Sequence, residues 1–316
     1  MSEQVAGQPA PRSPFARLIG VISSPKETFE EILRSPGWVP PWLCYLVILM
    51  VAMGIWSMKA DYVTIMTDQM EGSSFFKLVP EGQRDEVLNK ALEEFRKLTP
   101  AQITAETLIR AGGFQLPFFH GMALFYATLF VFLGSLKEIK LGRAWMQFLL
   151  CLLMLVGYFG VYFISNFAFR EAPDSRILLS GTATAALTVA WIWMLRRNAA
   201  ADPELGRLVS VCMYSTAVTM IWAIVFAAIS LGTAAPIQVY LDKMVKSNVG
   251  AYVATGVPAL QALLESLDIF TIGWFAVLTI GFRALTKLSV GMTASITFLP
   301  WAVFVLIKVA WAAVFG

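Results

Sequence analysis

Residues 208–231 read LVSVCMYSTAVTMIWAIVFAAISL, and this stretch decides the fold class. It carries no charged side chain, and a helix of its 24 residues is about 36 Å long, more than the roughly 30 Å hydrocarbon core of a bilayer. Charge-free stretches also cover 35–58, 111–136, 144–169 and 177–195, and shorter apolar runs follow at 269–282 and 288–307. We therefore predict an all-α, polytopic transmembrane helical bundle of about seven spans.

The composition supports a membrane protein. Hydrophobic residues make up 58% of the chain and charged residues 14%, whereas soluble domains average roughly 45–50% and 25%. The net charge of +3 is dispersed over 316 residues, so we expect no nucleic-acid partner. Cys44, Cys151 and Cys212 lie inside predicted spans without CxxC spacing. We interpret them as small buried hydrophobes, which gives no disulfide framework and no metal site.

The distribution of Lys and Arg predicts an orientation. The short connectors 137–143, 196–207 and 283–287 are basic, and all three fall on the same side as the amino terminus. Because short cytoplasmic loops carry an excess of Lys and Arg, we expect a cytoplasmic amino terminus. An odd number of spans then places the carboxyl terminus outside. The polar segment before the first apolar run predicts a retained helix rather than a cleavable signal peptide.

The first 36 residues form the predicted cytoplasmic tail and interfacial helix. Residues 1–14 are rich in Pro, Ser and Gly and are expected to be disordered. The stretch SPKE at 24–27 predicts a helix start, with Ser24 as the cap and Glu27 completing a capping box. The apolar residues nearby are Phe15, Leu18, Ile19, Val21, Phe29, Ile32 and Leu33. We expect this region to lie along the inner membrane surface; packing on the protein itself is the alternative.

The remaining chain divides into one span, a connector and a bundle. The first span, 37–58, is opened by two prolines and flanked by tryptophans that would anchor it at the interfaces. The connector 59–113 contains an amphipathic stretch at 81–98, which predicts an external helical cap, or alternatively a solvated spacer. Residues 114–316 form the predicted membrane bundle. Its three hairpins pair 115–136 with 144–166, 177–195 with 208–231, and 267–285 with 290–313.

Two details of this bundle leave alternatives open. The apolar stretch 257–267 at the end of the insert 233–266 is too short to span, so the insert is expected to form helices that lie on the outer surface or are partly re-entrant. Two of the hairpins turn through similar strings, KLGR at 140–143 and ELGR at 204–207. A glycine after a helix end with an arginine at the boundary explains this similarity, and an internal repeat of the kind that builds many transporters is the other interpretation.

No catalytic constellation is present in the sequence. It contains one histidine, His120, and no HExxH, Walker or GxSxG pattern. An intramembrane histidine is a candidate functional residue because polar groups are costly there. We expect His120 to be a hydrogen-bonded packing residue near the outer boundary. The chain is therefore predicted to be no enzyme, with no catalytic residue, cofactor or metal.

Lys308 lies well inside the last span and predicts an intramembrane polar pair. If the last hairpin turns near Leu288, Asp268 lies 20 residues before the turn and Lys308 20 residues after it. Antiparallel helices would place both at similar depth, so we expect Lys308 to face Asp268, or Glu265 one turn earlier, near the outer boundary. A lysine that extends alone to the headgroups is the alternative. Extending span six back to Leu264 would place Asp268 and Arg283 at opposite interfaces.

Several segments resemble the Yip family of membrane proteins, named for interaction with Ypt/Rab GTPases, in its prokaryotic branch. The matching segments are SPKETF at 24–29, LDIFTIGW at 267–274, GFR at 281–283, PW at 300–301, Lys308, and the span 206–229 with Tyr214-Ser215. The resemblance implies a helical protein of the bacterial cytoplasmic (inner) membrane with a cytoplasmic amino terminus. The chain departs from the family in having seven apolar runs rather than five. The DLYGP-type motif is absent, so the resemblance does not extend to GTPase binding.

Two functions follow as expectations. The first is a non-enzymatic membrane scaffold or organiser that sits in the lipid bilayer and recruits protein partners at its amino-terminal helix or its external cap. The second is a transporter or channel for a lipid or small solute. A polar, water-accessible cavity would favour the second function, and a solidly packed bundle would favour the first.

Overall fold

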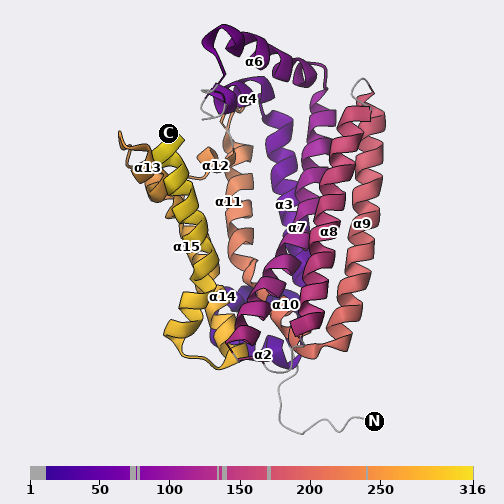
Figure 1. Cartoon of the computed structure of the whole chain (residues 1–316), viewed down its shortest axis with the longest axis vertical. Helices are drawn as coiled ribbons and strands as arrows, with labels where there is room; N and C mark the ends of the chain where they lie inside the picture. The colour runs from indigo at the N-terminus through magenta and orange to yellow at the C-terminus, as the bar shows by residue number, and fades with distance from the viewer. Residues whose placement is uncertain are drawn as a thin grey trace.

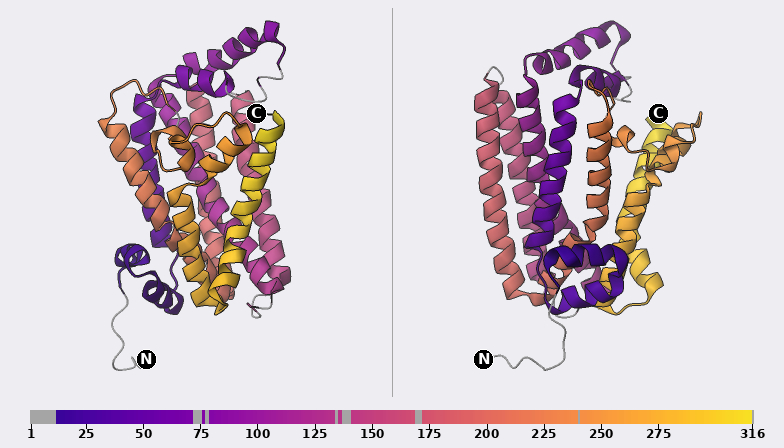
Figure 2. Two further views of the ribbon diagram at one scale, coloured as in Figure 1. Left: turned by 90° about the vertical axis from the view of Figure 1, so that its left-hand side faces the viewer. Right: turned by 180° about the vertical axis from the view of Figure 1, so that it is seen from behind.

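The computed structural model describes residues 12–71, 76, 79–133, 135–136, 141–168, 172–239 and 241–315. Within these residues the chain folds into helices without a β-strand, as predicted. Long helices lie side by side in one bundle (Figure 1). Two short helices, α1 (Pro14–Ser23) and α2 (Pro25–Arg34), form an amino-terminal hairpin across one end, which we call the hairpin end (Figure 2). The opposite end, which carries α4 (Tyr62–Glu71) and α6 (Glu81–Arg96), is the cap end.

The long helices run between these two ends. They are α3 (Val39–Lys59), α7 (Pro100–Phe132), α8 (Leu141–Ala168), α9 (Pro173–Ala201), α10 (Pro203–Ser215) continued by α11 (Ala217–Gly232), α14 (Ile269–Thr286) and α15 (Val290–Phe315). Among the described residues, six of these segments are long and apolar enough to cross a membrane. The remaining predicted span, 144–166, coincides with α8, which has 28 residues, several with side chains outside the described set.

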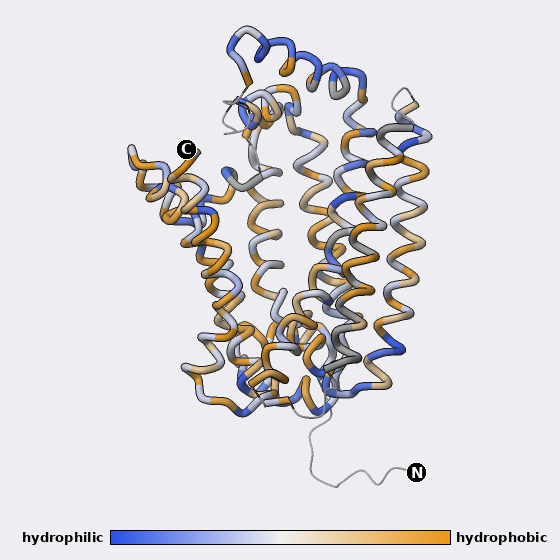
Figure 3. The backbone as a smooth tube through the Cα atoms, viewed as in Figure 1, coloured by the Kyte–Doolittle hydropathy of each residue, from blue (hydrophilic) through white to orange (hydrophobic). Residues whose placement is uncertain are grey.

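Apolar and hydrophilic residues occupy different parts of the bundle. Apolar residues predominate along the long helices, and hydrophilic residues gather on α6 and at the hairpin end (Figure 3). Large apolar side chains are exposed along α8, α9 and α15, among them Leu153, Leu178 and Leu306. On a soluble protein such surfaces would be aggregation sites, whereas here they form the surface that lipid would cover.

The core of the bundle is built around α10. Every residue of α10 from Leu208 to Ser215 is buried, and the helix packs against α7, α9, α14 and the amino-terminal hairpin. The predicted span 208–231 breaks at Thr216, which was not expected. The hydroxyl of Thr216 donates to the carbonyl of Met213 at 2.6 Å, and the hydroxyl of Thr219 donates to the carbonyl of Thr216 at 2.8 Å. Threonine hydroxyls therefore compete for backbone acceptors at the break.

Two predicted boundaries were wrong because local caps override the charge pattern. α7 begins at Pro100, since Thr99 and Gln102 form a capping box, so residues 100–113 belong to a long helix rather than to the 59–113 connector. α14 begins at Ile269, where the predicted apolar run 269–282 begins, so the extension of span six back to Leu264 is wrong. The helix starts there because the carboxylate of Asp268 accepts a hydrogen bond from the amide of Thr271 at 2.7 Å.

The segment between α11 and α14 lies at the cap end. It contains α12 (Leu241–Met244), the short 3-10 helix η1 (Val249–Ala251) and α13 (Pro258–Ser266), and none of these is long enough to span. The predicted glycine after a helix end was wrong in both similar strings. Gly142 and Gly206 lie instead in the first turns of α8 and α10.

Lys59 ties α3 to the cap end of α11. Its Nζ donates to the carbonyls of Ser230, Leu231 and Thr233 at 2.9, 2.9 and 3.1 Å. These carbonyls lie at or just beyond the last turn of α11, where backbone acceptors lack intrahelical donors and the helix dipole favours a positive charge. The ammonium group of Lys59 thus caps the carboxyl end of α11, which lies far from it in sequence.

Candidate functional site

The amino-terminal hairpin is a tight pair of helices. A Cβ on Gly20 of α1 would lie 2.5 Å from Oγ1 of Thr28 in α2, so glycine permits this close approach. α2 starts at Pro25 as predicted, but the capping box was wrong, because the side chain of Ser24 makes no capping hydrogen bond. Residues 1–11 of the segment predicted to be disordered lie outside the described residues, and Ser13 caps α1.

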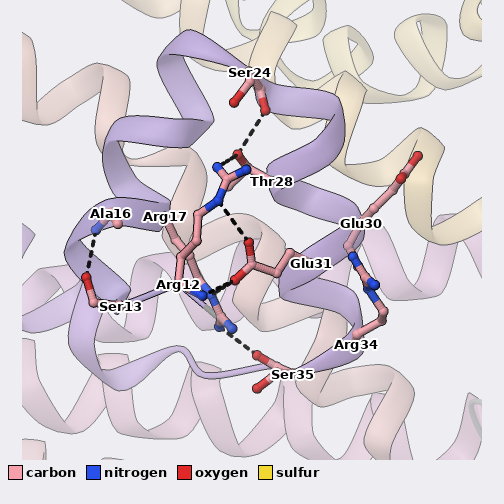
Figure 4. Close-up of polar contacts among 10 residues, drawn as sticks. All are labelled: Arg12, Ser13, Ala16, Arg17, Ser24, Thr28, Glu30, Glu31, Arg34 and Ser35. Atoms are coloured by element: carbon pink, nitrogen blue, oxygen red, sulfur yellow. Dashed lines mark hydrogen bonds and ion pairs between the residues drawn. The ribbon is translucent and has the colours of Figure 1, made fainter. Parts of the chain in front are cut away.

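A cluster of charged side chains holds the two helices together (Figure 4). The Nε atom of Arg17 donates to Glu31 at 3.0 Å, and its Nη1 atom donates to the carbonyl of Ser35 at 2.8 Å. The backbone amide of Arg12 donates to the same carboxylate at 2.7 Å. The side chain of Arg17 is 6% exposed and that of Glu31 15%, so this ion pair is largely removed from solvent.

The pKa of Glu31 is lowered from its ordinary value. Burial is the largest single influence and acts to raise this pKa. The hydrogen bonds from the Arg12 amide and the Arg17 side chain, together with both positive charges, outweigh burial and lower it. Glu31 is therefore an ionised acceptor that stabilises the hairpin at neutral pH.

The hairpin docks on the bundle through α2. Phe29 and Ile32 are fully buried, and a Cβ on Gly281 of α14 would lie 3.0 Å from Phe29 and 2.5 Å from Val211 of α10. Arg207 donates from Nε to the carbonyl of Leu33 at 3.1 Å, which satisfies an acceptor at the end of α2. α2 therefore packs on the protein itself, which was the alternative given for this region.

A groove of about 1000 Å³ lies between α2 and α14 at the hairpin end. Its charged lining residues are Lys26, Glu27, Glu30, Arg283 and Lys287, with Thr279, Ile280 and Ala284 on the α14 wall. Arg283 lies in the last turn of α14, and it is exposed like Lys26 and Lys287. We call this feature the α2–α14 groove. It presents three cations and two carboxylates around a partly apolar floor.

The basic residues that predicted the orientation gather at this end. Arg196 lies near the end of α9, Arg207 near the start of α10, and Arg283 near the end of α14. Lys137 and Lys140 lie outside the described residues.

The structure pairs Lys308 with Glu265 rather than with Asp268. Nζ of Lys308 lies 3.3 Å from Oε2 of Glu265, and their side chains are 38% and 44% exposed. Asp268 instead caps α14 and accepts a hydrogen bond from the hydroxyl of Ser247. Counting residues from the hairpin turn placed Lys308 correctly beside Glu265. It did not predict that the carboxylate of Asp268 caps α14.

His120 lies inside the bundle, bonded to an indole. Nε1 of Trp191 in α9 donates to Nδ1 of His120 at 3.1 Å, and both side chains are buried. His120 lies 12 residues before Phe132 in α7, or about 18 Å from the hairpin end of that helix. The expected position near the outer boundary was wrong, since α7 extends past the charges at its cap end. The histidine is a packed, hydrogen-bonded residue between α7 and α9.

A second polar site, which the sequence did not predict, lies toward the cap end. Glu106 of α7 forms an ion pair with Arg176 of α9, and its other oxygen lies 3.6 Å from Nη2 of Arg110. Glu106 and Arg176 are buried. The sequence interpretation placed Glu106 and Arg110 in the connector, although their spacing of four residues is the signal of a shared helix face.

Among the residues that the structure describes, no group of three or more His, Cys, Asp or Glu side chains is placed to hold a metal ion. Cys44 and Cys212 are free thiols, the latter buried, and the side chain of Cys151 lies outside the described set.

The fold fits an integral membrane protein of the helical-bundle class, because six helices in the described part of the chain are long and apolar enough to cross a membrane. No family model, curated protein or solved structure matches the chain.

Proposed function

We propose that this chain is a non-enzymatic integral membrane protein of the Yip type, which acts as an organiser that recruits a protein partner on the cytoplasmic side. The proposal depends chiefly on the α2–α14 groove. Its α2 wall is anchored by the Arg17–Glu31 pair and by the packing of Phe29 against Gly281. A wall fixed in this way gives a partner a preformed surface and lowers the ordering cost of binding.

The other face of the hairpin supports its position at the membrane surface. Phe15, Ile19 and Ile22 of α1 are exposed and follow one another at helical spacing. Leu43 and Val47 at the near end of α3 are exposed as well. An apolar stripe next to apolar spans fits insertion into the lipid boundary, and it leaves the charged face of α2 toward the aqueous side.

Site-directed photocrosslinking in cells tests this function. A photoreactive residue at Glu27, in the groove, should give a discrete protein adduct, and the same residue at exposed Glu86 of α6 should not give it. Arg283→Ala should weaken the adduct at Glu27. Only lipid adducts at Glu27, or the same adducts at both positions, would contradict partner recruitment through the groove.

Transport of a lipid or small solute is the second candidate function. It is favoured by a cavity of about 840 Å³ between α3, α4, α7 and α8, a size typical of ligand pockets, which are roughly 300–1,000 Å³. Flux across liposomes that contain the purified protein distinguishes the two functions. Flux above that of protein-free liposomes would favour transport, and its absence together with a specific groove adduct would favour recruitment.

A further inference from the structure

The cavity toward the cap end has the shape of a site for an elongated apolar group. We call it the cap-end cavity. Its wall along α3 runs from Trp56 to Tyr45, with Met53 and Leu49 between them. Trp56 and Tyr45 are 11 residues apart, so this wall is about 16 Å long. The apolar and aromatic lining suits a hydrocarbon chain.

One buried amide on the α7 side of the cavity lacks a hydrogen-bond partner among the described residues. Gln115 is 6% exposed and lines the cavity, and neither its Oε1 nor its Nε2 has a hydrogen-bond partner among the described residues. An unsatisfied amide away from water costs free energy, and few such groups persist in native proteins. A ligand with an acceptor or donor at this depth, such as an ester carbonyl, would satisfy it.

The charged residues beside the cavity favour an anion. Glu106 and Arg110 both line it, and Glu106 is already paired with buried Arg176. The guanidinium groups of Arg110 and Arg176 therefore both face the carboxylate of Glu106. The Arg110 side chain is 51% exposed, so its guanidinium is accessible to a ligand. Arginine binds phosphate through charge-assisted hydrogen bonds.

The cavity also reaches the surface that lipid would cover. Phe118 of α7 and Phe159 of α8 line it, and both are exposed on the outside of the bundle. A molecule could therefore enter sideways from the bilayer.

We propose that the cap-end cavity binds one anionic phospholipid from the leaflet at the cap end. One acyl chain lies along the α3 wall, the phosphate lies at Arg110, and Gln115 bonds to the ester region. This site goes beyond the proposed recruitment of a partner and does not depend on it, because the α2–α14 groove lies at the opposite end of the bundle.

Titration of the delipidated full-length protein with defined lipids tests the site. Phosphatidylglycerol, phosphatidylcholine and inorganic phosphate are added separately, and bound lipid is counted by native mass spectrometry. We expect one saturable phosphatidylglycerol, bound about tenfold more tightly than phosphatidylcholine. Both lipids carry the phosphate, but the choline ammonium of phosphatidylcholine would lie near the guanidinium groups of Arg110 and Arg176 and be repelled by them. Equal binding of both lipids would overturn the anionic assignment. Inorganic phosphate that competes as well as the lipid would overturn the acyl-chain assignment.

Three variants locate the binding within the cavity. Arg110→Gln should weaken phosphatidylglycerol binding about tenfold and leave the Glu106–Arg176 pair in place. Ala111→Phe, which fills the cavity, should abolish binding. Gln115→Leu should weaken binding but keep or raise the melting temperature of the lipid-free protein, because it removes an unsatisfied amide. This opposite response makes a folding defect distinguishable from loss of the site.

The control is Arg197→Gln, which removes an exposed arginine at the hairpin end. Cζ of Arg197 lies 5.4 Å from the centroid of the Trp193 ring. It should bind phosphatidylglycerol like the parent protein. If folded Ala111→Phe binds the lipid as tightly as the parent protein, or if Arg197→Gln weakens binding as much as Arg110→Gln, the proposed site is wrong.

Discussion

Replacing Glu31 by Gln should release the amino-terminal hairpin. The substitution keeps the size of the side chain but removes the charge that accepts from Arg17 and from the Arg12 amide. Arg17 then remains 6% exposed with a positive charge that no carboxylate neutralises. Breaking a buried ion pair costs about 3–5 kcal/mol. Because Glu31 is 15% exposed and the amide oxygen of glutamine still accepts one hydrogen bond, we expect Glu31→Gln to destabilise docking of the hairpin by about 2–3 kcal/mol.

Hydrogen exchange of the α2 amides measures this change. A loss of 2–3 kcal/mol shifts the equilibrium toward the undocked hairpin about 30- to 150-fold, and amides that exchange through undocking should exchange faster by the same factor. The matched control is Glu30→Gln, one residue earlier, which makes the same chemical change at an exposed position. The control should change exchange by only about twofold, since exposed substitutions are usually within about 0.5 kcal/mol.

The comparison between the two variants can refute the reasoning. If Glu31→Gln and Glu30→Gln exchange at the same rate, the Arg17–Glu31 pair does not hold the hairpin. If the exchange of α10 amides also rises in Glu31→Gln, the change has loosened the bundle rather than released the hairpin.

Four further predictions concern pH, a helix end, an exposed ion pair and a close helix contact. Because the folded pKa of Glu31 is lowered from 4.5, the stabilisation that Glu31 gives to the hairpin is present above pH 4.5 and is lost as the pH falls through the folded pKa. The distance between spin labels at Ser23 and Lys287 should therefore increase below about pH 4.5. In Glu31→Gln this distance should not show the same pH dependence. Lys59→Met removes three donors to α11 and should cost about 1.5–3 kcal/mol, measured by thermal unfolding in detergent; no change would exclude the proposed helix-end role. Lys308→Met should cost less than about 1 kcal/mol in the same assay, because its partner Glu265 is exposed; a larger loss would contradict the assignment of this ion pair as exposed and weak. Gly281→Val should raise exchange in α2 more than in α15, because its side chain would collide with Phe29 and Val211; unchanged exchange in α2 would contradict the close contact.

The fold class was predictable because hydrocarbon imposes strong rules on sequence. A charge-free stretch long enough to cross a bilayer satisfies its own backbone hydrogen bonds only as a helix, so the long runs could be placed from composition alone. Boundaries were less predictable. The apolar run ends at the charged residue Arg110, but α7 begins ten residues earlier at Pro100, because Thr99 and Gln102 form a capping box there. The break at Thr216 depends on which hydroxyls turn back to the backbone, which spacing does not reveal.

The candidate site was predicted only in part. The last hairpin gave the depth of Lys308 correctly, because antiparallel helices fix register by counting. The pairing of Glu106 with Arg176 joins residues 70 positions apart on two helices, and no local pattern indicates it. The groove likewise depends on how α2 lies against α14. Single-sequence reasoning identified Arg283 as polar and at an interface, but did not identify the surface to which it belongs.

Cysteine labelling in sealed membrane vesicles tests the membrane topology most directly. The three native cysteines are replaced, and single cysteines are placed at Lys26 on α2, Glu86 on α6 and Lys243 on α12. An impermeant maleimide should label the first position from the cytoplasmic side only, and the other two from the opposite side only. Labelling of Lys26→Cys and Glu86→Cys from the same side would contradict a bundle that spans the bilayer between its hairpin end and its cap end.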